Sequence, residues 1–269
     1  MTWTYQIVTV VALTALIHLV ATLSYSVRLV GARTGRVAVS FALFNVLTLV
    51  TRTANTLQAP LLAKHVETNI ASERLTGDLG TFRWILLAAT VGTLAGGLLI
   101  PTFQRLFGRM IRAFGVHRSV PRLLLHGFMK LGVRHLREAA KLPSRENVAT
   151  LGRRPPVPVR MLLLNVGAAS VMTVGVLASM YAAYLAPELR ATCQSLSAII
   201  NGVATVALVL AVDPYLSMLT DDVVAGSVSQ VFFRRAVTWF VLTKLIGTLT
   251  AQLLLQPAAH VIAVLAHWV

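Results

Sequence analysis

Six long apolar stretches alternate with short polar ones along the chain. We place them near residues 6–26, 37–63, 83–104, 158–185, 195–216 and 235–257. Each can cross about 30 Å of hydrocarbon, which takes roughly 20 helical residues. The composition agrees, because 56% of the 269 residues are hydrophobic, 12% are charged and the mean hydropathy is +0.74. The pattern predicts an all-α integral membrane protein with about six transmembrane helices, forming a single polytopic domain over residues 1–269.

The positive charges are divided unequally between the two sides that these spans define. Eighteen of the 24 Lys and Arg fall on one side: three from Arg28 to Arg36, thirteen from Arg105 to Arg160, and the pair Arg234 and Arg235. Segments rich in Lys and Arg stay on the cytoplasmic side of a membrane. We therefore expect this side to face inward and both termini to face outward.

The inner segment of about residues 105–157 contains a basic amphipathic pattern. Basic or His side chains recur every three or four residues from Arg122 to Lys141, and leucines fall largely off that stripe. The spacing predicts a helix lying on the inner leaflet, where each cation near anionic phospholipids contributes about 1 kcal/mol. The alternative is that the charges only fix the topology. Nucleic acid is not an expected partner, because aromatic residues are not interleaved with the cations.

Two parts of the chain are similar at an offset of 155 residues. The stretch WILLAATVGTLAGGLL, which starts at Trp84, aligns with WFVLTKLIGTLTAQLL, which starts at Trp239. Residues 1–107 thus resemble residues 158–269, and each part has three spans. Two three-span copies must be inverted relative to each other, and inverted repeats are typical of transporters with a midplane site. The Gly-x-x-x-Gly pattern from Gly92 to Gly96 predicts close helix packing.

Polar side chains inside the spans are the candidate substrate-binding residues. They are Asn45, Arg52, Asn55 and Gln58 on the second span, Lys244 and Gln252 on the sixth, and His18 on the first. A cation at mid-membrane costs about 2.5–3.5 kcal/mol on insertion scales, and we see no acidic residue deep in a span to neutralise one. We predict that Arg52 and Lys244 face a common polar cavity and bind an anion, and that Pro60 ends or kinks the second helix. The alternatives are that the cations bind backbone carbonyls and amides or reach an interface, and that His18 is a packed core residue.

Enzyme motifs are missing from the sequence. It contains no His-Glu-x-x-His, no Cys-x-x-Cys and no phosphate-binding loop with its Lys. Cys193 is the only cysteine, which excludes an intramolecular disulfide. We therefore predict no catalytic residue, no cofactor and no metal site.

The segment from Leu16 to Lys64, LIHLVATLSYSVRLVGARTGRVAVSFALFNVLTLVTRTANTLQAPLLAK, resembles the Amj-type lipid II flippases, an alternative to the MurJ flippase. The motifs that carry the resemblance are Ser-Tyr-Ser with Arg two residues on, Arg-Thr-Gly-Arg, Phe-Asn and Thr-Arg-Thr-Ala-Asn. Thr51 stands where we expect Ser. The resemblance continues through GTLAGGLLIPTFQR and is weakest in the basic segment.

The resemblance implies a flippase of the bacterial cytoplasmic membrane and not an enzyme. Such a protein would move undecaprenyl-pyrophosphate-linked peptidoglycan precursor, lipid II, from the inner to the outer leaflet. The resemblance assigns no site residues, so the candidates above rest on the sequence pattern. Two alternatives stay open: a transporter of small anions or solutes, and a non-catalytic scaffold of the cell-envelope machinery. A homodimer is compatible with each.

Overall fold

The computed structural model describes residues 4–72, 78–117, 140–143, 149 and 154–269, with only the backbone for 112–117. Within these ranges the regular structure is helical throughout, without strands. Six helical stretches are long and apolar enough to cross a membrane: Tyr5–Thr34, Val37–Ala71, Leu79–Ile111, Val159–Leu185, Pro187–Val224 and Gln230–Ala266. They confirm the all-α, six-span membrane fold.

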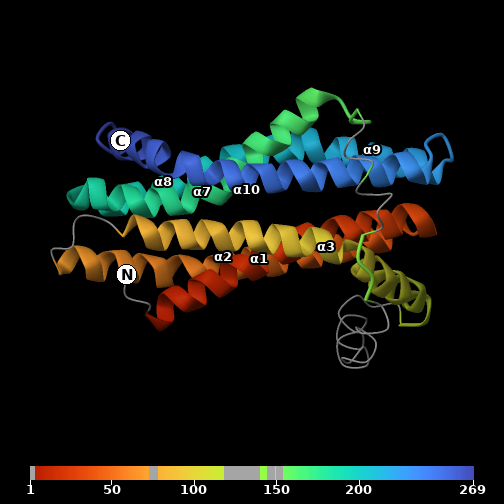
Figure 1. The fold of residues 1–269 in the computed structure, drawn as a ribbon, viewed down its shortest axis with the longest axis horizontal. Helices are drawn as coiled ribbons and strands as arrows, with labels where there is room; N and C mark the ends of the chain where they lie inside the picture. The colour runs from red at the N-terminus through yellow and green to blue at the C-terminus, as the bar shows by residue number, and fades with distance from the viewer. Residues whose placement is uncertain (1–3, 73–77, 118–139, 144–148, 150–153) are drawn as a thin grey trace.

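The spans run back and forth along one long axis (Figure 1). Their elements are α1 (Tyr5–Thr34), α2 (Val37–Ala71), α3 (Leu79–His117), α7 (Val159–Leu185), α8 (Arg190–Ala207), α9 (Asp213–Val224) and α10 (Gln230–Ala266). A 3-10 turn, Pro187–Leu189, precedes α8, and a π-helical turn, Leu208–Val212, joins α8 to α9. Both chain termini lie at one end of the molecule, which we call the terminal end. The opposite end, where α1 turns into α2 and α9 into α10, holds the start of the basic segment and is called the basic end.

Most of the helices extend beyond the predicted apolar stretches. Of the two outcomes expected for Pro60, an end or a kink of the second helix, the structure excludes the end: α2 continues through Pro60 to Ala71, and α10 likewise passes Pro257 and continues to Ala266. A proline removes one backbone hydrogen bond. Ending a helix within the bilayer would leave several backbone groups without partners, so continuation costs less.

The two halves of the chain pack in the same order. In the first half α1 lies along α2 and α3, and in the second half α7 lies along α8 and α10. Gly92 of α3 lies so close to the backbone of Ala15 in α1 that a side chain there would collide with it. At the equivalent place in the second half, a Cβ on Gly247 of α10 would lie 2.7 Å from the Cβ of Ala169 in α7. The close packing predicted for Gly92 is therefore confirmed.

The halves meet where α3 lies beside α10, along a line that we call the seam (Figure 1). At the terminal end an aromatic cluster of α3 and α7 lies close to this line. The ring of Phe82 packs edge-on against Tyr181 and Tyr184, with ring centroids 5.5 and 6.3 Å away. Phe82 is fully buried, so this part of the molecule is closed by a packed core.

Candidate functional site

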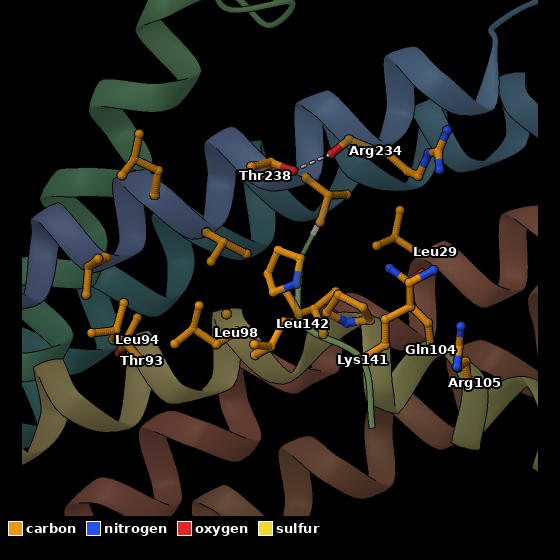
Figure 2. Close-up of a pocket in the computed structure, with 18 of the residues that line it drawn as sticks. Leu29, Thr93, Leu94, Leu98, Gln104, Arg105, Lys141, Leu142, Arg234 and Thr238 are labelled. Atoms are coloured by element: carbon orange, nitrogen blue, oxygen red, sulfur yellow. Dashed lines mark hydrogen bonds between the residues drawn. The ribbon is translucent and has the colours of Figure 1, made fainter. Parts of the chain in front are cut away.

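A groove of about 480 Å³ follows the seam from the middle of the α3 span to the basic end. Figure 2 shows its walls, which are mostly aliphatic side chains such as Leu94 and Leu98 of α3. It extends along α3 from Thr93 to Arg105, which corresponds to roughly 18 Å of helix. Leu94 and Leu98 are 49% and 44% exposed, so the groove borders a surface at membrane depth. The groove therefore offers a long apolar surface that lipid can reach.

Cations gather at the mouth of the groove. Arg33 of α1, Arg105 of α3, Lys141 and Arg234 of α10 line it, and all four side chains are exposed. Figure 2 shows Arg105, Lys141 and Arg234 at the same end, away from Leu94. No carboxylate is among the residues that line the groove in the described part of the chain. The groove is thus apolar along its length and positively charged at one end.

A short described part of the basic segment, residues 140–143, forms part of the mouth. The buried hydroxyl of Thr102 accepts a hydrogen bond from the backbone N–H of Lys141, at 3.0 Å, and donates one to its carbonyl, at 3.1 Å. These two bonds fasten the backbone of residues 140–143 to α3. The Lys141 side chain therefore projects from a fixed point of attachment.

Polar side chains from three helices meet at the inner end of the groove. Thr93 lines the groove, and its Oγ1 lies 3.4 Å from Nδ1 of His18 in α1. Lys244 of α10 lies near enough to His18 for an electrostatic interaction, and its Nζ is 5.9 Å from the ring centroid of Tyr25. Within the described residues no carboxylate lies at ion-pair distance from Lys244. We call His18, Tyr25, Thr93 and Lys244 the inner polar cluster.

The candidate residues of α2 lie elsewhere. Asn45, Arg52 and Asn55 are exposed and line neither this groove nor the smaller hollow described below. Gln58 is buried, and its Oε1 has no hydrogen-bond partner among the residues that the structure describes. The structure does not bring Arg52 and Lys244 into one described cavity, because α2 packs chiefly against α1, whereas α10 packs against α7 and α3.

Gln252, the remaining candidate on α10, lies at the closed end of the seam. Its Nε2 donates a hydrogen bond of 3.1 Å to the backbone carbonyl of Arg83 in α3. In the alignment of the two halves Gln252 occupies the position of Gly97, which lines the groove. At the terminal end the side chain of Gln252 therefore reaches across the seam, whereas at the basic end Gly97 leaves space between the helices.

An ion pair that involves a buried arginine was missed by the sequence analysis. There Arg28 served only as one of the charges that follow the first span, and Asp213 was given no role. In the structure Arg28 is 8% exposed inside α1, and its Nη2 lies 2.6 Å from Oδ1 of Asp213. Arg28 also donates to Ser217 at 3.3 Å and lies over the ring of Phe44, beside a hollow of about 210 Å³. The available signal was that both charges fall near the inner ends of their spans.

The predicted amphipathic helix of the basic segment lies almost entirely outside the described residues. Only positions 140 and 141 of that stretch belong to the part that the structure describes.

Comparison with known proteins agrees with the resemblance seen in the motifs. A family model with the description "Alternate to MurJ", named Amj, matches residues 13–266. A protein of Bacillus subtilis (strain 168) called "Lipid II flippase Amj" is 36% identical over 266 residues, which are 98% of either chain. No solved structure matches. The chain belongs to the Amj family.

Proposed function

We propose that this protein is a lipid II flippase, which carries the head group of this undecaprenyl-linked precursor from the inner to the outer leaflet of the bacterial cytoplasmic membrane. The support is membership of the Amj family and a relative that bears the name lipid II flippase over nearly the full length of both chains. The role is that of a transporter and not of an enzyme.

One structural observation carries the proposal: the groove along the seam is apolar on its walls and cationic at its mouth. Lipid II combines a long hydrocarbon tail with a pyrophosphate and a polar head. Exposed leucines at membrane depth let the tail stay in lipid while the head enters from one end. A carrier of small anions would not need this apolar access, because its substrate has no tail.

The symmetry of the two halves is a further part of the proposal. The equivalent packing of Gly92 and Gly247 supports two repeats, about residues 1–107 and 158–269, joined by the basic segment. Because each repeat has three spans, the second is inverted relative to the first. Charge places the basic end in the cytoplasm and both termini outside, with anionic phospholipids of the inner leaflet as partners of the basic segment. A homodimer stays a prediction from the sequence.

The substrate-binding residues proposed from the sequence divide into two groups. Lys244 and His18 lie beside the inner end of the groove and are placed to attract the negatively charged head as it moves inward. Asn45, Arg52, Asn55 and Gln58 lie on α2, and Gln252 lies at the terminal end. These residues would act at later stages of passage, when the head has left the mouth.

Two assays test the proposal. Cells lacking other flippases should grow when this protein is expressed, and proteoliposomes containing it should expose labelled lipid II in the opposite leaflet. Failure of these cells to grow when the protein is expressed, together with no exposure of lipid II in proteoliposomes, would contradict it. Movement of inorganic phosphate or small anions without lipid II would instead assign the protein to the small-anion class.

Variants that each remove one positive charge test the proposed substrate-binding residues. Arg52→Gln and Lys244→Met should each abolish complementation at normal abundance, and Arg52→Lys should restore part of it, because Lys lacks the planar fork of Arg. Lys64→Gln is the control, since Lys64 is an exposed cation on the same helix as Arg52. Full activity of both Arg52→Gln and Lys244→Met would favour the scaffold.

A further inference from the structure

We propose that Arg33, Arg105, Lys141 and Arg234 form a binding subsite for the pyrophosphate of a polyprenyl carrier lipid at the mouth of the groove. This inference rests on the proposed function and adds the place where the carrier is first bound. In the sequence analysis these four residues served to predict which side of the membrane faces inward.

The first support is the convergence of the four cations. They come from α1, α3, residues 140–143 of the basic segment and α10, and they line one groove. Among the described residues that line it, four are cations and none is a carboxylate, so these residues give its mouth a net positive charge. Arg can bind phosphate oxygens through two parallel N–H groups, and Lys adds a point charge. A group with two linked phosphates matches such a set better than one with a single phosphate.

The second support is that only some of the basic side chains at the basic end line the groove. The positive-inside rule counts charges without regard to the direction in which they point. Arg109 and Arg160 are exposed at this end but do not line the groove, and Arg235 donates to the carbonyl of Arg154. The groove therefore singles out a subset of cations, which topology alone does not explain.

The third support is the position of the subsite relative to the apolar walls. Leu98 lies about two turns before Arg105 on α3, and Leu94 lies one turn further in. A carrier whose pyrophosphate is at the mouth can lay its first isoprene units on these leucines. Thr102 holds the backbone of Lys141 against α3, so the point from which this side chain extends is fixed before the ligand arrives.

Phospholipids also present phosphate at this face, so the source of the phosphate must be tested. The assay uses the full chain in nanodiscs of phosphatidylcholine and measures binding of a fluorescent undecaprenyl pyrophosphate. Unlabelled undecaprenyl pyrophosphate, undecaprenyl monophosphate, phosphatidylglycerol and inorganic pyrophosphate serve as competitors. We expect the unlabelled pyrophosphate lipid to compete best, because it offers both the tail and the linked phosphates.

The decisive variant is Arg105→Gln/Arg234→Gln, compared with the charge-matched control Arg109→Gln/Arg160→Gln. The first should weaken binding about tenfold or more, as expected when charge-assisted hydrogen bonds are lost, and the control should bind like the wild type. Equal binding by both variants would overturn the proposal. Equal competition by phosphatidylglycerol would also overturn it, since the mouth would then be a general site for anionic lipids.

The outcome is separable from that of the proposed function. If the wild type exposes lipid II but Arg105→Gln/Arg234→Gln binds the carrier normally, the subsite is wrong and the flippase assignment stands. If the wild type binds the pyrophosphate lipid with the expected selectivity but never exposes lipid II, the flippase assignment fails and the subsite stands.

Discussion

The two ends of the seam between α3 and α10 are built from similar sequence but differ in structure. At the basic end Gly97 lines a groove that lies between the helices. At the terminal end the aligned residue, Gln252, reaches across to the carbonyl of Arg83, near the packed rings of Phe82 and two tyrosines. The basic end, which has Gly97, is thus open, and the terminal end, which has Gln252 at the aligned position, is closed.

This difference shows that two stretches of similar sequence can give the two ends of the seam different access. If the two halves were identical at this position, both ends would be open or both closed. Gly at one position and Gln at the other break the equivalence, while the close glycine contacts at Gly92 and Gly247 are present in both halves. Among the described residues, the seam therefore has a groove at the basic end and packed side chains at the terminal end.

The largest effect should come from filling the open end. Gly97→Gln places in the groove the side chain that crosses the seam at the other end, and translocation should fall to the level of cells without the protein. Among the described residues, a Cβ at this position would meet only Cγ1 of Val241, at 3.1 Å, and a shift of a few tenths of an ångström relieves that contact, so Gly97→Ala should keep most of the activity. The measurement is exposure of lipid II at equal protein abundance. Normal transport by Gly97→Gln would show that the groove is not the route.

A smaller but distinct effect should come from breaking the ion pair beside the basic end. Asp213→Asn leaves the buried Arg28 without its counter-charge, and unfolding should become easier by about 2 kcal/mol. Thermal unfolding in detergent measures the loss. Hydrogen exchange should rise in α9 and the end of α1 but not near Phe82. Replacement of both charges, in Arg28→Met/Asp213→Leu, should recover most of the stability, and failure to do so would assign the effect to packing.

A weaker effect on stability should come from removing the hydrogen bond at the closed end. Gln252→Ala removes the hydrogen bond to Arg83 and should cost about 1 kcal/mol of local stability. We expect faster hydrogen exchange in residues 80–90 with unchanged exchange around Gly97. Gln256→Ala, one turn further along α10, is the control, because Gln256 is exposed. Unchanged exchange in Gln252→Ala would show that the aromatic cluster alone closes this end.

The smallest effect should come from releasing Lys141. Thr102→Val removes the hydroxyl that holds residues 140–143 to α3 and keeps a side chain of nearly the same shape. Affinity for undecaprenyl pyrophosphate should fall by about a factor of two to five, since the two hydrogen bonds that are lost, each of about 1 kcal/mol, position only one of the four cations and do not contact the ligand. Thr90→Val is the control, because Thr90 makes its hydrogen bond within its own helix. A loss as large as that of Arg105→Gln/Arg234→Gln would mean that Thr102 supports the whole mouth.

The sequence was sufficient for the fold because each span shows its own apolar pattern, and the glycines of α3 indicated where helices approach closely. Local patterns could not reveal contacts between distant segments. Arg28 and Asp213 are 185 residues apart, and their pairing depends on how α9 lies against α1. Arg105 and Arg234 looked like topology signals because nothing in the sequence shows that they line one groove.

The candidate site was predicted in part for the same reason. Lys244 and His18 were chosen separately as polar residues in apolar helices, and the structure brings them together beside Thr93. Arg52 was expected to join them, but helical periodicity gives the face of a helix and not its neighbour. Gln252 was predicted to bind substrate, and in the structure it bonds to Arg83 across the seam. The alignment pairs Gln252 with Gly97, so the sequence already showed that these two positions differ in side-chain size.

The hydrogen bond between Gln252 and Arg83 also has a consequence for populations. A contact of about 1 kcal/mol favours one state only about fivefold. Thermal fluctuations can break such a bond often, so it adds only a small bias to the packing around Phe82 and does not by itself hold the terminal end closed. A protein with this small bias tends to equalise its substrate between the two leaflets. The net direction of movement would then be determined by how quickly the precursor is consumed on the far side.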